Sequence, residues 1–250
     1  MPTITAHCII KNEENFVGYA IKSVIDFVDT VLVFDTGSTD KTVNIVQGLI
    51  KEYPNKIIFE EKGECDKIRH TQLHQEMVDR TKTDWFMILD GDEVWTKRAM
   101  EEVKEIIEKG SFDGIKTGFY ECVGDIYHRH YKESYVTARF AKVGDAVWKG
   151  DYNQDKLCTK AGEDFFKTKN IYTLQNRFWH LTHLLRSAKD SSDYSSGGSR
   201  AGKRIKTYFF LGRTISEPVP EVFNGGNFKL SMTRSLINFA LLVISRLKNL

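Results

Sequence analysis

The stretch that decides the fold is residues 85–93, WFMILDGDE, in which an apolar run leads directly into an acidic turn. A short apolar run bounded by polar residues is typical of a strand that is buried on both faces of a parallel sheet. The carboxylates that follow, Asp90, Asp92 and Glu93, repel one another unless a cation lies between them. Mg²⁺ and Mn²⁺ prefer carboxylate oxygens, so the turn predicts either a divalent-metal site or an acidic start to the next helix.

Strands and helices alternate on the amino-terminal side of this turn and just beyond it. Apolar runs predict strands at 4–10, 31–34, 56–60 and 84–89, and helical spacing predicts helices at 15–27, 38–50, 66–80 and 96–108. Strands joined by helical crossovers form a mostly parallel sheet with helices on both faces. Ligands of such sheets bind beyond the carboxyl ends of the strands, so we expect the site there.

The pattern changes after residue 113. Short β-like runs at 114–120, 135–143 and 170–174 predict a small mixed or antiparallel extension. We assign 114–186 to it as the second half of the domain that 1–113 begins. Residues 187–230 are rich in Ser, Gly and Pro, which predicts a flexible loop and an irregular segment. Residues 231–250 predict an apolar helix with basic edges.

Composition places the chain among ordinary globular proteins. It has 250 residues, 41% of them hydrophobic and 28% charged, which excludes collagen-like, low-complexity and wholly disordered chains. The four cysteines form no C-x-x-C pair, and the first residues lack the pattern of a signal peptide, so we expect reduced thiols and a cytoplasmic location.

The net charge of +2 is unevenly distributed. Residues 186–250 hold 11 Lys and Arg against 4 Asp and Glu, whereas the rest of the chain is acidic. The basic end suggests either contact with an anionic partner or a solvated surface. The apolar run 236–244 is too short to span a bilayer, so the final helix is expected to pack on the body, to self-associate or to lie peripherally at the inner face of a membrane. We expect no nucleic-acid partner.

Two further polar clusters follow predicted strands. Residues 11–14, KNEE, come after the first strand, and residues 35–40, DTGSTD, come after the second. The first cluster is also explained by a polar loop with a helix cap. The second is also explained by a capped helix start, which would account for Ser38 and Asp40 but not for Asp35. Because the carboxyl ends of parallel strands meet at one edge of a sheet, we expect both clusters to share a cleft with the acidic turn.

Together, residues 9–14, 31–42 and 88–93 resemble the successive motifs of the family 2 glycosyltransferases, in particular the branch with K-N-E-E and D-T-G-S-T-D. The resemblance implies a GT-A fold, in which a Rossmann-like sheet merges with an acceptor region. It also implies a nucleotide-sugar donor (a UDP-sugar ahead of a GDP-sugar), a divalent Mn²⁺ or Mg²⁺ ion and an inverting transfer. The acceptor would be a hydroxyl of a glycan, of a lipid-linked molecule or of another compound.

The resemblance also implies roles for residues in the first half of the chain. Asp35 would bind the nucleobase, and Asp90 would face the ribose or a metal-bound water. Asp92 would hold the metal that bridges the diphosphate. The remaining donor-binding residues implied are Lys11, Asn12, Glu13 and Arg69.

The inverting reaction also needs a general base, which we expect from the second half. Asp164 resembles the family's acidic motif, and Asp155 competes with it. His180 and His183, three residues apart, would share a helix face as metal or diphosphate ligands, or would be ordinary polar residues. Arg186 would help to hold the diphosphate.

Two alternatives stay open at this stage. Residues 90–94 also resemble the loop of haloacid-dehalogenase-like phosphatases, in which the first aspartate, here Asp90, is the nucleophile and Asp92 follows it. A non-catalytic nucleotide-sugar-binding module is the other alternative, because Asn153 and Gln154 stand where the glycosyltransferase branch often has H-E.

Overall fold

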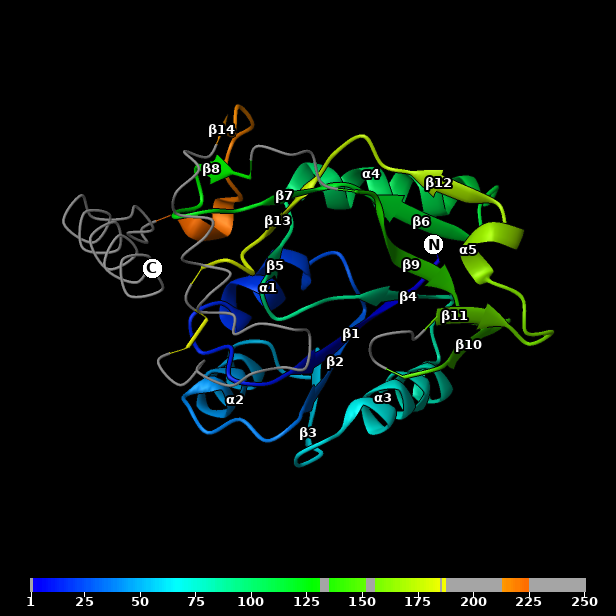
Figure 1. Cartoon of the computed structure of the whole chain (residues 1–250), viewed down its shortest axis with the longest axis horizontal. Coiled ribbons are helices and arrows are strands. Elements are labelled where there is room, and N and C mark those ends of the chain that lie inside the picture. The colour runs from blue at the N-terminus through cyan, green and yellow to red at the C-terminus, as the bar shows by residue number, and fades with distance from the viewer. Residues whose placement is uncertain (1, 131–134, 152–155, 185, 188–212, 225–250) are drawn as a thin grey trace, which may run out of the picture.

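The computed structural model describes residues 2–130, 135–151, 156–184, 186–187 and 213–224 (Figure 1). The helices are α1 (Val17–Val24), α2 (Thr42–Glu52), α3 (Lys67–Arg80), α4 (Lys97–Lys109), α5 (Phe165–Thr168) and the 3₁₀ helix η1 (Glu221–Phe223). The strands are β1 (Ile4–Ile10), β2 (Thr30–Asp35), β3 (Ile57–Glu61), β4 (Trp85–Ile88), β5 (Glu93–Val94), β6 (Gly114–Thr117), β7 (Phe119–Glu121), β8 (His128–Arg129), β9 (Thr137–Lys142), β10 (Ala146–Lys149), β11 (Lys156–Thr159), β12 (Ile171–Thr173), β13 (Phe178–His180) and β14 (Arg213–Thr214).

One large sheet organises the described part of the molecule, with strand order β12-β6-β9-β4-β1-β2-β3. Strands β1 to β4 pair in parallel, as the alternating pattern predicts. Strand β9 runs antiparallel between β4 and β6 and so joins the two halves of the chain into one sheet (Figure 1). The predicted α/β architecture with a mixed extension is therefore confirmed.

Helices cover both faces of the sheet, and the side chains of β2 illustrate why. Val31 and Val33 belong to the core that contains the buried residues of α1 and α4. Leu32 and Phe34 point to the opposite face and pack with the apolar residues of α3. Since successive strand residues alternate between faces, a strand that is apolar throughout must be covered on both sides.

Helix α4 begins and ends where its sequence predicts. The Thr96 side chain accepts a hydrogen bond from the backbone N–H of Ala99, which satisfies one of the free donors of the first turn. Gly110 closes the helix with φ +70°, a left-handed conformation that glycine adopts at little cost.

The run 114–120 does not form one strand. It divides at Gly118 into β6, which joins the large sheet, and β7, which pairs with β13 in a three-stranded sheet. The hydroxyl of Thr117 donates to the carbonyl oxygens of Gly118 and Asn176, both at 2.9 Å, and so stabilises the change of direction.

The expected helix that would place His180 and His183 on one face is wrong, because His180 is the last residue of strand β13.

Several predictions lie outside the described residues: the final helix at 231–250, most of the 187–230 loop, Asp155 and the pair at 153–154. None of the helices in the described ranges has the length and apolar character that crossing a membrane requires.

Candidate active site

A cavity of about 820 Å³ opens at the carboxyl ends of β1 and β4. The edge of the sheet there is extended by the end of β6 and the start of β9, which contribute Lys116, Thr137, Ala138 and Arg139 to the wall. Of the predicted site residues, the cavity is lined by Lys11, Glu13, Asp90, Asp92, Asp164, His180 and Arg186. The structure thus gathers predicted residues from positions 11 to 186 around one cavity.

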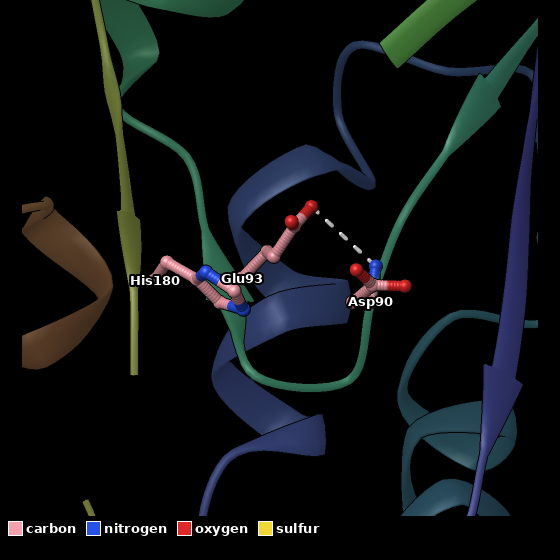
Figure 2. A group of neighbouring side chains, drawn as sticks. All are labelled: Asp90, Glu93 and His180. Carbon is pink, nitrogen blue, oxygen red and sulfur yellow. Dashed lines mark hydrogen bonds between the residues drawn. The ribbon is translucent and has the colours of Figure 1, made fainter. Parts of the chain in front are cut away.

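The acidic turn links the large sheet to the small one. It leaves β4 and enters β5, and β5 pairs antiparallel with β13, which sets Glu93 opposite His180 (Figure 2). The backbone N–H of Leu181 donates to the carbonyl oxygen of Asp92 at 2.8 Å. Strand pairing therefore brings a histidine from the second half of the chain against the acidic turn of the first.

His180 and Asp92 form a buried ion pair, with 3.5 Å between Nε2 and Oδ1. Burial opposes a charged imidazole, but the Asp92 carboxylate outweighs it and raises the pKa of His180 to about 9. Burial likewise opposes the charged Asp92, and His180 and Arg186 together outweigh it and lower the Asp92 pKa to about 2. Without a bound metal, both groups are therefore charged at neutral pH.

Arg139, from β9, is the second cation at the turn. Its Nη2 lies 3.2 Å from Asp90 Oδ2 and also donates to the buried Glu93 carboxylate. Burial raises the pKa of Glu93 to about 8, although the attraction of Arg139 opposes this shift. Arg139 thus contacts both the half-exposed Asp90 and the buried Glu93 and favours the charged form of Glu93.

The turn also offers a set of metal-ligating atoms. One atom from each of Asp90, Glu93 and His180 lies within 4.8 Å of the others (Figure 2). The Nδ1 atom of His180 is buried and has no hydrogen-bond partner among the described residues. Carboxylate oxygens and one imidazole suit a hard or borderline divalent ion, so these residues fit Mn²⁺ or Mg²⁺. The structure places Asp92 next to this set through its ion pair with His180.

The loops after β1 and β2 are joined by side-chain hydrogen bonds. Asn12, which has φ +53°, donates its backbone N–H to Ser38 Oγ at 2.9 Å, and its Oδ1 accepts from the N–H of Thr39 at 2.8 Å. Asn12 does not line the cavity. Its contacts fix the position of its neighbours Lys11 and Glu13, which do.

Asp35 is buried at the end of β2. Its Oδ1 accepts hydrogen bonds from the backbone N–H groups of Gly37 and Ser38, at 3.0 and 2.9 Å, and Gly37 has φ +87°. The Oδ2 atom is buried without a hydrogen-bond partner among the described residues. The Oδ1 atom of Asp35 therefore stabilises the turn, and its Oδ2 atom can accept a hydrogen bond from a further donor. Thr36, the next residue, lines the cavity.

Glu13 is held beside the acidic turn by two contacts. Its carboxylate pairs with Arg186, and its backbone N–H donates to Thr42 Oγ1 at 2.8 Å. A Cβ atom at Gly91 would lie only 2.8 Å from Glu13 Cγ. The glycine is thus required because the first loop and the acidic turn approach each other closely.

Helix α3 and the hairpin β10–β11 form another part of the wall. The rings of His74 and Trp148 stack with centroids 4.6 Å apart, and both residues line the cavity. Arg69 is on α3 but does not line it, and its Nη2 lies 3.5 Å from Glu76 on the same helix. The structure therefore leaves Arg69 at the edge of the site, half-exposed.

Asp164 lines the cavity from the start of α5. Its Oδ1 accepts a hydrogen bond from the backbone N–H of Phe166 at 3.1 Å, so it caps this short helix. Its Oδ2 lies 3.8 Å from Lys167 Nζ. His183, in contrast, bonds to Glu121 Oε1 at 2.8 Å and does not line the cavity.

Sequence reasoning missed three contributors to this site: Arg139, His74 and Trp148. The only sequence signal for Arg139 is its position within a run predicted as a strand. A charged residue in such a run implies a buried partner, but the sequence does not identify that partner. Nothing in the local sequence distinguishes His74 from His70, the other histidine of α3. Their roles depend on which elements the fold brings together.

The fold is of the GT-A type, with a mostly parallel sheet and a ligand-sized cavity at its carboxyl edge. The model of the family described as "Glycosyl transferase family 2" matches residues 6–178. The chain therefore belongs to glycosyl transferase family 2, as its three motifs predict.

Curated relatives cover part of the chain. It is 32% identical over 190 residues to an uncharacterized glycosyltransferase of Rickettsia bellii, which covers 72% of this chain and 60% of that protein. It is 26% identical over 130 residues to the glycosyltransferase SunS of Bacillus subtilis, which covers 50% of this chain and 29% of SunS. In both cases the match spans less than two thirds of the relative's own length.

A solved structure shares the fold. The crystal structure of S. aureus TarS 1–349 has a TM-score of 0.52 and 13% sequence identity, over 72% of this chain and 60% of that one. The TarS structure in complex with UDP-GlcNAc has a TM-score of 0.51 and 11% identity, over 82% of this chain and 64% of that one.

Proposed function

We propose that this protein transfers a sugar from a nucleoside diphosphate sugar to a hydroxyl acceptor. The observation that supports this most directly is the convergence of the loops after β1 and β2 with the acidic turn after β4 around one cavity of about 820 Å³. This volume is in the range of small-molecule sites. The complex of the similarly folded TarS with UDP-GlcNAc supports a UDP-sugar as donor, ahead of a GDP-sugar.

In this proposal the nucleotide half of the donor lies over the ends of β1 and β2. The Oδ2 atom of Asp35, which has no hydrogen-bond partner among the described residues, would accept a hydrogen bond from the base, and Lys11 would contact a donor oxygen. Asn12 acts by fixing the two loops, because its contacts are with Ser38 and Thr39. Arg69 would reach the donor only by leaving Glu76, so its proposed role in donor binding depends on that rearrangement.

The diphosphate would lie at the acidic turn. Asp92, Asp90 and His180 would hold Mn²⁺ or Mg²⁺, whereas His183 is engaged with Glu121 and is a weaker candidate. When bound, the ion would supply Lewis-acid stabilisation of the charge that develops on the leaving nucleoside diphosphate. Arg186, 3.9 Å from Asp92, would add a positive charge on the same side of the cavity.

Inverting transfer needs a carboxylate that accepts the proton of the acceptor hydroxyl. Asp164 lines the cavity and meets this requirement, although its Oδ1 already caps α5. Asp155 remains the alternative base. A glycan or a lipid-linked molecule remains the expected acceptor, and contact with a membrane or self-association through residues 231–250 remains a proposal.

A titration of UDP- and GDP-sugars, with and without Mn²⁺, tests the donor assignment through the thermal stability of the protein. We expect stabilisation by a UDP-sugar that increases when Mn²⁺ is present. Asp92→Asn should abolish the effect of the metal, and His183→Asn, which alters a histidine outside the cavity, should preserve it. Failure of every donor to change the melting temperature would contradict the proposal.

A catalytically inactive nucleotide-sugar-binding protein is the second candidate, because Asn153 and Gln154 stand where the resemblance leads us to expect H-E. Under this alternative the donor binds but neither transfer nor slow hydrolysis occurs. Measurable nucleoside diphosphate release that is lost in Asp92→Asn would exclude it. The phosphatase alternative is set aside, because the chain belongs to glycosyl transferase family 2.

A further inference from the structure

Three lysines that the donor proposal does not use lie along the second half of the cavity wall: Lys116, Lys156 and Lys167. They come from β6, β11 and α5, three elements that follow the acidic turn in sequence. The Nζ of Lys116 lies 3.4 Å from the carbonyl oxygen of Phe166, which places it against α5. We call these three residues the lysine edge.

Hydrogen bonds and strand pairing bring the parts of the lysine edge together. Asp164, at the start of α5, forms a β-bridge with Cys158, two residues after Lys156. The backbone N–H of Thr159 donates to the carbonyl oxygen of Glu163 at 2.8 Å. Strand β11 and helix α5 are thus adjacent, and the lysines on them border one region of the cavity that includes Asp164.

The charges of the lysine edge are poorly compensated. Among the described residues, no carboxylate lies within ion-pair distance of Lys116 or Lys156, and Lys167 is 3.8 Å from Asp164. The two arginines that line the cavity are, in contrast, paired with acids: Arg139 with Asp90 and Glu93, and Arg186 with Glu13. In the part of the chain that the structure describes, the cavity therefore has an acidic region whose charges are paired and a region with excess positive charge.

Aromatic and polar groups border the same region. Trp148 pairs with Leu157 across the β10–β11 hairpin, next to Lys156. The ring of Phe166, on α5, has its centroid 5.5 Å from Lys116 Nζ. The Nε1 of Trp148 and the Nδ1 of His74 are buried and have no hydrogen-bond partner among the described residues. A ligand with an apolar face and hydroxyl groups would suit such a wall.

We infer that the acceptor carries a phosphate group, which the lysine edge binds while an acceptor hydroxyl lies near Asp164. The inference rests on the proposed function and names the chemical class of its second substrate. Lysine binds phosphate as a mobile point charge, and three lysines around one opening suit an anion of one or two charges. The donor diphosphate is the competing anion, but its proposed place is at the acidic turn.

Binding of glycerol 3-phosphate, with glycerol as the uncharged comparison, tests this inference in the full-length chain saturated with UDP and Mn²⁺. We expect calorimetry to detect glycerol 3-phosphate but not glycerol. Each of Lys116→Gln, Lys156→Gln and Lys167→Gln should weaken binding by up to about fivefold, the scale of one partly exposed charge contact. The triple variant should lose binding altogether.

Lys160→Gln is the matched control, because Lys160 is exposed directly after β11 but does not line the cavity. It should leave the affinity unchanged. Vesicles of phosphatidylglycerol, compared with phosphatidylcholine, provide a second arm that distinguishes a lipid headgroup from a soluble phosphate compound. Melting temperatures of all variants establish that they are folded.

Three results would overturn the inference: equal affinity of the triple variant and the wild type, competition between glycerol 3-phosphate and UDP for one site, or absence of binding by glycerol 3-phosphate and phosphatidylglycerol. The second result would place the phosphate at the donor end. Failure of the proposed function would give a different result, because in that case no nucleotide sugar would bind to the protein. Donor binding without any binding of glycerol 3-phosphate or phosphatidylglycerol would therefore reject only the phosphate-bearing acceptor.

Discussion

Arg186 and Glu13 form a buried ion pair although they lie 173 positions apart in the sequence. The backbone carbonyl of Arg186 also accepts a hydrogen bond from the N–H of Asn15 at 2.9 Å. The guanidinium reaches further to Asp92, at 3.9 Å. One residue from the second half of the chain thus holds the first loop and the acidic turn in a common position.

Replacement of Arg186 should destabilise the protein as well as weaken the site. Arg186→Ala leaves Glu13 and Asp92 with less positive charge in a buried position, which typically costs about 3 kcal/mol in the free energy of unfolding. Urea unfolding measures this change. The double variant Arg186→Met, Glu13→Gln should recover part of the loss, because it removes a buried carboxylate together with its partner. Equal stability of Arg186→Ala and the wild type would contradict the proposed contact.

The stability of the metal-free protein should fall as the pH rises from 6.5 to 9. His180 has a pKa of about 9 when folded against 6.5 for the free side chain, so its stabilising proton is fully bound below pH 6.5 and is lost towards pH 9. Glu93 acts in the same direction between pH 4.5 and about 8, because burial raises its pKa. One pH unit between folded and unfolded pKa values is worth about 1.4 kcal/mol, so the combined decrease amounts to a few kcal/mol.

Urea unfolding in the presence of EDTA at several pH values measures this dependence. His180→Asn should flatten the curve above pH 6.5, and Glu93→Gln should flatten it between pH 4.5 and 8. At the acid end the direction reverses, since Asp92 has a pKa of about 2 against 3.8 and its contribution is lost as the pH falls through that range. Rising stability of the wild type between pH 6.5 and 9 would disprove the assignment of these protons.

Replacing each of two glycines by alanine should change the stability of the protein in opposite directions. In Gly91→Ala the new Cβ would lie 2.8 Å from Glu13 Cγ and 3.1 Å from Ile10 Cγ2. Overpacking of this kind costs about 1–3 kcal/mol, and the displacement of Glu13 should weaken donor binding. Gly48→Ala, inside α2 with no atom within 4 Å of the new Cβ, should stabilise the protein by about 0.5–1 kcal/mol. Calorimetric unfolding and donor titration of both variants provide the comparison.

Asp164→Asn separates a catalytic role from a structural one. Asparagine caps helices as well as aspartate does, so α5 and the free energy of unfolding should be nearly unchanged. As a general base, however, the amide cannot accept the acceptor proton, and kcat should fall by about 100-fold or more while the KM for the donor stays constant. An unchanged kcat in this variant would exclude Asp164 as the general base and favour Asp155.

Local sequence pattern was sufficient for the framework of the fold. Apolar runs and helical spacing predicted β1 to β4 and α1 to α4 because these elements bury whole strands or one helix face. Thr96 and Gly110 marked the ends of α4, since capping depends on a few adjacent residues. The break at Gly118 was missed, because only the pairing of β7 with β13 explains it.

The sequence by itself determined the family, the α/β framework and the polar clusters at the ends of the strands, because each depends on residues close together in the chain. Only the tertiary structure decided which charges meet. It set His180 beside Asp92, Arg139 beside Glu93 and Arg186 beside Glu13, whereas it set His183 beside Glu121. These pairs depend on strand register between distant segments, and burial of a charge is tolerated only where that register supplies its partner.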